Sequence, residues 1–153
     1  TARYAAERAT EADLTRLRSV VSTLQTAHAA KDLGALSKAD AAFHQAIADA
    51  AHNAMFSHLL ASLFTMMRTH VHDNIANLFA VGTVSSDLLA QHLAIFHAIE
   101  AHDPPAAQAA AEAHIDFVDR TLVRMRDESE REARSVRRAA VQGGSLPDPW
   151  RDR

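Results

Sequence analysis

The first 103 residues of this chain contain no proline, because the four prolines stand at positions 104, 105, 147 and 149. Proline breaks helices, since its ring removes a backbone donor and clashes with the preceding turn. Alanine, leucine, glutamate and arginine, which favour helix, dominate the sequence. No segment shows the alternating pattern of a half-buried strand. The sequence therefore predicts an all-α protein.

Apolar spacing and cap signals predict six helices. They are expected near residues 1–9, 11–30, 33–51, 53–79, 85–101 and from 104 onward, with a turn at 81–83. Thr10 and Asp13 form a capping-box-like start, and Asp103 before Pro104 is a second start signal. The expected apolar stripes are Leu14, Leu17, Val21 and Leu24 on the second helix, Phe56, Leu59, Leu60, Leu63 and Met67 on the fourth, and Ile115, Val118, Leu122 and Met125 on the sixth.

The length of 153 residues suits one domain with a real core. We expect a helical bundle over residues 1–125, with a truncated first helix, and a charged helix extension and disordered tail over residues 126–153. The net charge of −3 gives no sign of a nucleic-acid surface. The lack of cysteine excludes disulfides and thiolate metal sites, and no apolar run is long enough to span a membrane. A cytoplasmic protein is the expectation.

Ten histidines are many for this length, and three of them stand on apolar helix faces. His44 lies three to four residues from Asp40 and Ile47, so these side chains share one face. His92 and His114 stand in similar stripes. The partners in those stripes are Ile95, Phe96 and Ile99 for His92, and Phe117, Val118 and Leu122 for His114. Three helices therefore each direct a histidine toward one interior, and one of the helices adds a carboxylate.

A buried carboxylate needs a partner, and one metal ion bound by Asp40, His44, His92 and His114 would supply it. Facing helices of a bundle are where such sites are built. Nitrogen and oxygen ligands suit zinc, nickel, manganese or iron. Because ligating histidines must be neutral, metal affinity should fall below about pH 6.5. The alternative is three core histidines bonded to backbone carbonyls or to Asp40.

The same residues resemble the effector-binding FCD domain of FadR-subfamily GntR transcription regulators. The resemblance rests on Asp40-x-x-Phe43-His44-x-x-Ile47, on His92 followed by Ala98-Ile99, on Asp103 and on His114. It covers about residues 5–122, and the order and spacing of the four candidate ligands suit the metal-binding branch of the family. The winged helix-turn-helix of that family has no counterpart in this chain, so DNA binding would belong to an absent N-terminal segment.

The resemblance implies an antiparallel bundle of six to seven helices that forms a homodimer. It implies one divalent ion, zinc first, beside which a small organic acid would bind as effector. Arg68 is the expected basic residue near that pocket. The function implied is metabolite sensing for a DNA-binding regulator, and not catalysis.

Two other classes of protein remain open from the residues alone. A metal-dependent hydrolase would use the same four ligands to activate water. However, no second acid is placed as a general base, and neither Glu-x-x-His nor His-Glu-x-x-His occurs. A purely structural helical module would use the histidines only for packing. A sensor should bind an acid without consuming it, whereas a structural module should bind neither metal nor acid.

Overall fold

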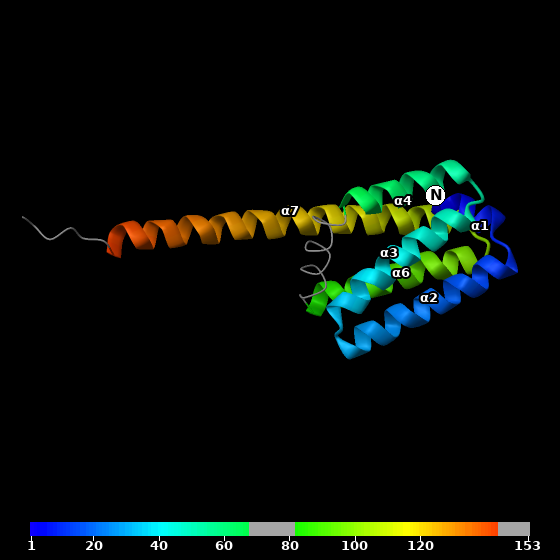
Figure 1. The fold of residues 1–153 in the computed structure, drawn as a ribbon, viewed down its shortest axis with the longest axis horizontal. Helices are drawn as coiled ribbons and strands as arrows, with labels where there is room; N and C mark the ends of the chain where they lie inside the picture. Colours follow the sequence, from blue (N-terminus) through cyan, green and yellow to red (C-terminus); the bar gives the residue numbers. More distant parts are fainter. Residues whose placement is uncertain (68–81, 144–153) are drawn as a thin grey trace, which may run out of the picture. The chain divides into compact units, whose positions relative to one another are not determined.

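The computed structural model describes the backbone of residues 1–67 and 82–143, all of whose regular elements are helices. These helices are α1 (Ala2–Arg8), α2 (Glu11–Ala30), α3 (Leu33–Ala50), α4 (Ala54–Met67), α6 (Gly82–Glu100) and α7 (Pro104–Gly143) (Figure 1). The prediction of an all-α protein is confirmed. None of the described helices is both long and apolar enough to cross a membrane.

Residues Thr1–Val118 form one compact unit, and the residues from Asp119 onward form a second. The second unit is the continuation of α7, where Arg134 and Glu130 make an exposed ion pair of 3.7 Å one turn apart. The first unit holds every candidate ligand that the sequence predicts, and it is the unit described below.

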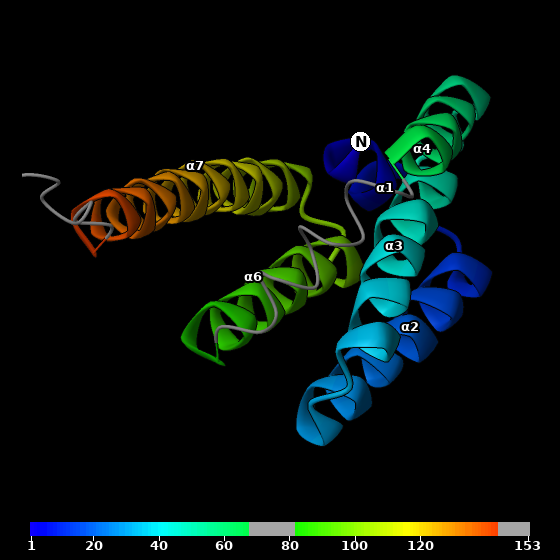
Figure 2. The same ribbon diagram turned by 60° about the vertical axis from the view of Figure 1, so that its left-hand side comes forward.

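The first unit is built around α3. Helix α2 packs on α3 and α6, α1 packs on the same two helices, and α4 packs on α3. Figures 1 and 2 show α2 and α3 side by side in both views. The predicted stripe of α2 is buried at all four positions, because the 3.6-residue period places these side chains on one face. The buried core of the unit also includes Phe43, Ile95 and Ile99.

The predicted helix starts are present. The Thr10 hydroxyl accepts from the Asp13 backbone at 3.3 Å, and an Asp13 carboxylate oxygen accepts from the Thr10 backbone at 2.9 Å. Asp103 accepts from the backbone N–H of Ala106 at 3.0 Å. These bonds satisfy donors that a helix start leaves free, so the chain turns where its sequence indicates.

Two expectations about the middle helices are wrong in detail. Gly82 belongs to helix α6 instead of to a turn. On α4, Leu59 is 60% exposed and Leu63 is 47% exposed, although both belong to the predicted stripe. Helix α4 is apolar on several sides, so the spacing of its apolar residues does not show which side packs against other helices. Phe56 lies on the covered side and stacks on Tyr4 of α1, with ring centroids 5.8 Å apart.

Other expectations fall outside what the structure describes or differ on α7. Arg68 lies among residues 68–81, and the end of the predicted tail is formed by residues 144–153; both ranges are outside the described residues. On α7, Ile115 is 61% exposed, although the sequence places it in the apolar stripe.

Candidate metal centre

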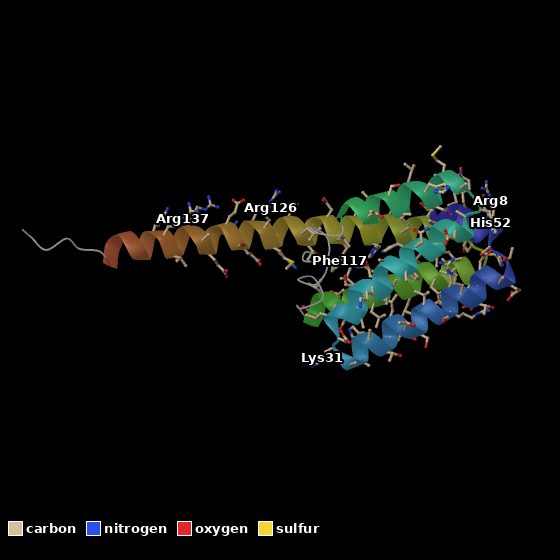
Figure 3. The ribbon with its side chains drawn as sticks, viewed as in Figure 1. Arg8, Lys31, His52, Phe117, Arg126 and Arg137 are labelled. Carbon is tan, nitrogen blue, oxygen red and sulfur yellow. The ribbon has the colours of Figure 1, made fainter. Side chains whose placement is uncertain are left out.

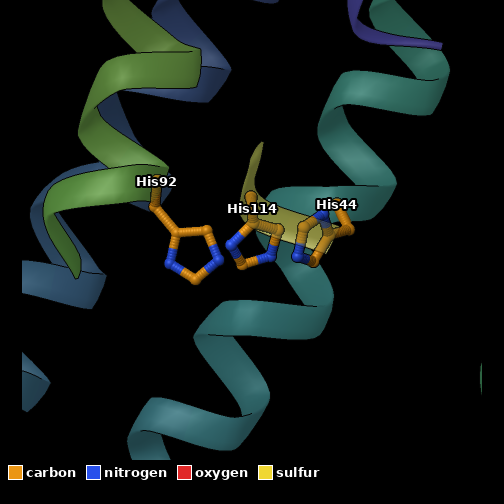
Figure 4. Close-up of side chains that lie close together, drawn as sticks. All are labelled: His44, His92 and His114. Atoms are coloured by element: carbon orange, nitrogen blue, oxygen red, sulfur yellow. The ribbon is translucent and has the colours of Figure 1, made fainter. Parts of the chain in front are cut away.

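Three imidazole rings from three helices converge inside the first unit (Figure 4). His44 comes from α3, His92 from α6 and His114 from α7. Each ring offers a nitrogen, and these nitrogens lie within 4.8 Å of one another. The ring centroids of His92 and His114 are 4.6 Å apart, and His44 lies 5.3 Å from each. Three histidines far apart in the sequence therefore form one cluster that can hold a metal ion.

Packing against Phe43 helps to place two of these rings. Phe43 is fully buried on α3, and its ring meets His44 at 5.5 Å and His92 at 5.0 Å, both edge to face. This arrangement is favourable because the edge of one ring is positive and the face of the other is negative. The aromatic side chain thus limits the rotation of both imidazoles.

Asp40 adjoins the cluster from one turn before His44 on α3. Its Oδ1 atom lies 3.2 Å from Nε2 of His92 and 3.8 Å from Nε2 of His44. Only 10% of the Asp40 side chain is exposed, so this carboxylate has little water around it. The structure thus brings all four predicted ligands together, with the three rings closest around one point and the carboxylate at their edge.

His92 holds the buried polar atoms of the cluster that have no hydrogen-bond partner. Its side chain is 1% exposed, and neither ring nitrogen has a hydrogen-bond partner. The approach of Nε2 to Asp40 is short, but it lacks the direction of a hydrogen bond. A buried polar atom without a partner costs about 1–3 kcal/mol. The donor set of three neutral nitrogens and a carboxylate suits a divalent ion such as zinc, so the residues present fit a metal.

The electrostatics of the site favour the protonation state that binds metal. Burial would raise the pKa of Asp40, but contact with His92 and the nearby rings of His44 and His114 lower it below its ordinary value. Burial lowers the pKa of His44. Burial, helped by the neighbouring rings of His92 and His44, lowers the pKa of His114 to about 3. Protons therefore compete for His114 at a pH well below the 6.5 that the sequence alone predicts.

His114 has a partner that the sequence did not reveal. Its Nδ1 atom lies 3.0 Å from the side-chain oxygen of Gln91, the residue before His92 on α6. No pattern along one helix could identify this pair, because it joins α6 to α7. The only signal is that Gln91 adjoins a predicted ligand.

A cavity of about 650 Å³ opens beside the cluster. His44 and His114 form part of its wall, together with Arg3 and Gln108 among others. The His44 side chain is 24% exposed, in keeping with this position. Among the described side chains that line the cavity, Arg3 supplies the one guanidinium group, and no sequence pattern singled it out. The Arg3 guanidinium also lies 3.1 Å from a carboxylate oxygen of Glu7, and Glu112 and Asp116 line the same cavity.

Two further histidines lie at helix ends, and each ring has a polar partner. His52 Nε2 lies 2.8 Å from a carboxylate oxygen of Asp13, and His102 Nδ1 lies 2.9 Å from the carbonyl oxygen of Ala6. Both have left-handed backbones, with φ of 47° and 51°, a conformation that usually selects glycine. They join the turns after α3 and α6 to the first two helices.

Comparison with known proteins gives the family. Residues 1–117 match the FCD domain. The chain is 34% identical over 137 residues to the "Putative L-lactate dehydrogenase operon regulatory protein" of Escherichia coli (strain K12), covering 90% of this chain and 52% of that protein. It is 34% identical over 122 residues to the HTH-type transcriptional regulator LutR of Bacillus subtilis (strain 168), covering 79% and 55%.

The chain thus spans about half the length of the curated relatives it matches. Both relatives are named as regulators. The order of Asp40, His44, His92 and His114 that suggested the resemblance lies inside the matched residues. The chain therefore belongs to the FCD domain family, the effector-binding domains of GntR-class transcription regulators.

Proposed function

We propose that this domain senses a small hydroxycarboxylate, which binds in the cavity beside one divalent metal ion. Asp40, His44, His92 and His114 are the proposed ligands of that ion. The observation that carries the proposal is the fully buried His92 ring, both of whose nitrogens lack a partner, in a cluster that borders a cavity of about 650 Å³. A cluster built only for packing would satisfy such a ring.

Each proposed ligand has a defined task. His92 supplies a buried nitrogen at the back of the site, and His44 and His114 supply nitrogens at the cavity wall. Asp40 supplies a negative charge that would offset part of the positive charge of the ion. Zinc is the first choice, with nickel, manganese and iron as alternatives. The ion would offer the effector a positive charge and open coordination positions.

The chemistry of the cavity supports an organic acid as effector. A carboxylate and a neighbouring hydroxyl provide two oxygens for a cation, and the Arg3 guanidinium in the cavity lining offers a charge-assisted contact. Arg68, the basic residue predicted from the sequence, remains a candidate for the same contact. The relative from Escherichia coli is named for an L-lactate dehydrogenase operon. L-Lactate, a 2-hydroxy acid, is therefore the first molecule to test.

In the whole protein, we propose that this domain forms a homodimer and acts in the cytoplasm on a DNA-binding domain that precedes it. The regulator names of both relatives support this role. Sedimentation should give twice the chain mass of 16.6 kDa. A species of 16.6 kDa alone at high concentration would count against the dimer.

The test of sensing combines metal analysis with thermal unfolding. The purified chain should contain one divalent ion, and L-lactate should raise its melting temperature. A ligand at a hundred times its Kd stabilises the folded state by about 2.7 kcal/mol, which corresponds to a shift of a few degrees for a domain of this size. The shift should vanish after chelation.

Matched variants make this test specific. His44→Ala should abolish the lactate shift, whereas His97→Ala should retain it, because the His97 side chain is 66% exposed and stands outside the cluster. A lactate shift that survives chelation would show that the metal is not the anchor. Lactate that is consumed would support the enzyme instead, and a chain that binds neither metal nor acid would support the structural module.

A further inference from the structure

We infer that Gln91 is a positioning residue of the metal centre, which holds His114 in the neutral form whose Nε2 keeps the lone pair and can serve as a ligand. This inference rests on the proposed function, since it concerns how the chain prepares a proposed ligand. Gln91 does not contribute a ligand atom itself. Its effect acts through the hydrogen bond between its side-chain oxygen and Nδ1 of His114.

The geometry of the pair is that of a sound hydrogen bond. The side-chain oxygen of Gln91 lies 3.0 Å from Nδ1 of His114, within the usual range for nitrogen and oxygen. His114 is 3% exposed and Gln91 is half-buried, so water competes little for this contact. The bond also connects α6 to α7, the two helices that supply His92 and His114. It therefore holds the two ligand-bearing helices in register.

The hydrogen bond to Gln91 determines which nitrogen of the neutral His114 ring carries the proton. One ring nitrogen carries the proton and the other carries a lone pair. Because an amide oxygen accepts, Nδ1 of His114 must donate, and the proton is therefore held at Nδ1. Nε2 keeps the lone pair that a metal requires. Ligating histidines commonly have their second nitrogen bonded in this way, and loss of such a partner typically lowers metal affinity about 10–100-fold.

His92 provides the contrast inside the same cluster. Neither of its nitrogens has a hydrogen-bond partner, although Oδ1 of Asp40 lies 3.2 Å from Nε2, so no hydrogen bond fixes which nitrogen carries the proton. His114 has a partner on Nδ1, so its form is chosen before any ion arrives. In this cluster, a hydrogen bond to Gln91 fixes the protonated nitrogen of His114, whereas a metal ion would have to orient the ring of His92.

Three variants test this inference. Gln91→Leu keeps the approximate size and helix preference of the residue but removes the acceptor, whereas Gln91→Glu keeps an acceptor. Gln25→Leu, at an exposed position of α2, is the matched control. We expect Gln91→Leu to bind Zn²⁺ about 10–100-fold more weakly than the parent. Gln91→Glu and Gln25→Leu should remain within a few-fold of the parent value.

Nitrogen-15 NMR of the metal-free chain adds a readout that packing alone would not change. The His114 ring should show Nδ1 protonated in the parent and in Gln25→Leu, and a mixture of both forms in Gln91→Leu. Equal Zn²⁺ affinity and an unchanged ring form in a folded Gln91→Leu variant would overturn the inference. A parent chain that binds no divalent ion would instead defeat the proposed function, while a shifted ring form would still support the role of Gln91 at His114.

Discussion

Five histidines of this domain form two groups that differ in the surroundings of their rings. The inner group is His44, His92 and His114, whose nitrogens converge in the interior. The turn group is His52 and His102, which lie at helix ends and contact Asp13 and the Ala6 carbonyl. Figure 3 shows His52 near Arg8, whose guanidinium donates to the carbonyl of Ala51 at 3.1 Å.

This contrast indicates where function lies. In the turn group, each ring has an acceptor beside it, and its contact stabilises the fold. In the inner group, His92 has no hydrogen-bond partner although it is buried. An uncompensated polar group in a core lowers stability, and the proposed metal site rests on this observation. The type of residue is the same in both groups, and the surroundings separate the two roles.

Metal binding should separate the two groups most strongly. His92→Leu should lower Zn²⁺ affinity by at least about 100-fold, because it removes a proposed ligand. Loss of a residue that only hydrogen-bonds to a ligand already lowers metal affinity about 10–100-fold. His102→Ala should leave affinity unchanged, since this residue belongs to the turn group. Competition with a chromophoric chelator measures both. Equal affinity in the two variants would remove the distinction.

The next effect concerns pH and the metal-free chain. The pKa of His114 is about 3 when folded, against an ordinary 6.5. Lowering the pH below 6.5 protonates the unfolded ring but not the folded one, so stability falls until about pH 3 and is restored above pH 6.5. Between about pH 7 and about pH 5, this ring alone should lower the free energy of unfolding by about 2 kcal/mol.

Urea unfolding at the two pH values measures that loss. His114→Leu should lose about 2 kcal/mol less than the parent over the same interval. His44 acts in the same direction, because burial lowers its pKa also, so some pH dependence should remain in the variant. Identical pH dependence in parent and variant would mean that the His114 ring is not buried as described.

A smaller effect concerns the stability of the metal-free chain, which a substitution in the core is expected to raise here and usually lowers. In the metal-free chain, His92→Leu should raise the free energy of unfolding by less than about 1–2 kcal/mol, because it removes two buried nitrogens without hydrogen-bond partners but also the ring that lies 3.2 Å from the Asp40 carboxylate. With Zn²⁺ in excess, the parent should become the more stable protein. Unfolding of both proteins with and without metal measures this reversal. A variant that is less stable than the parent in both conditions would place His92 among the ordinary packing residues.

The turn group should give the weakest effect. His102→Ala should lower stability by about 1 kcal/mol, since the ring loses its hydrogen bond to the Ala6 carbonyl. His102→Gly should lose less, because glycine adopts the left-handed backbone of this position without strain. The difference in free energy of unfolding between the two variants, measured with urea, separates the contribution of the side chain from that of the backbone conformation. A larger loss for glycine than for alanine would contradict this account.

Local features of the sequence are enough to predict the helices and the direction of their faces. The absence of proline before position 104 and the caps at Thr10 and Asp103 predict where helices run. The 3.6-residue period places Asp40 and His44 on the same side of α3 as Phe43. Each of these features depends on residues a few positions apart. The four candidate ligands can therefore be named from the sequence alone.

Features that depend on distances between helices appear only in the folded chain. Gln91 meets His114, His92 meets no hydrogen-bond acceptor, and Arg3 lines the cavity. The covered side of α4 is the Phe56 side, while Leu59 is exposed. A helical period gives the direction of a side chain within its own helix. What that side chain meets depends on how separate helices pack, which no spacing along one helix records.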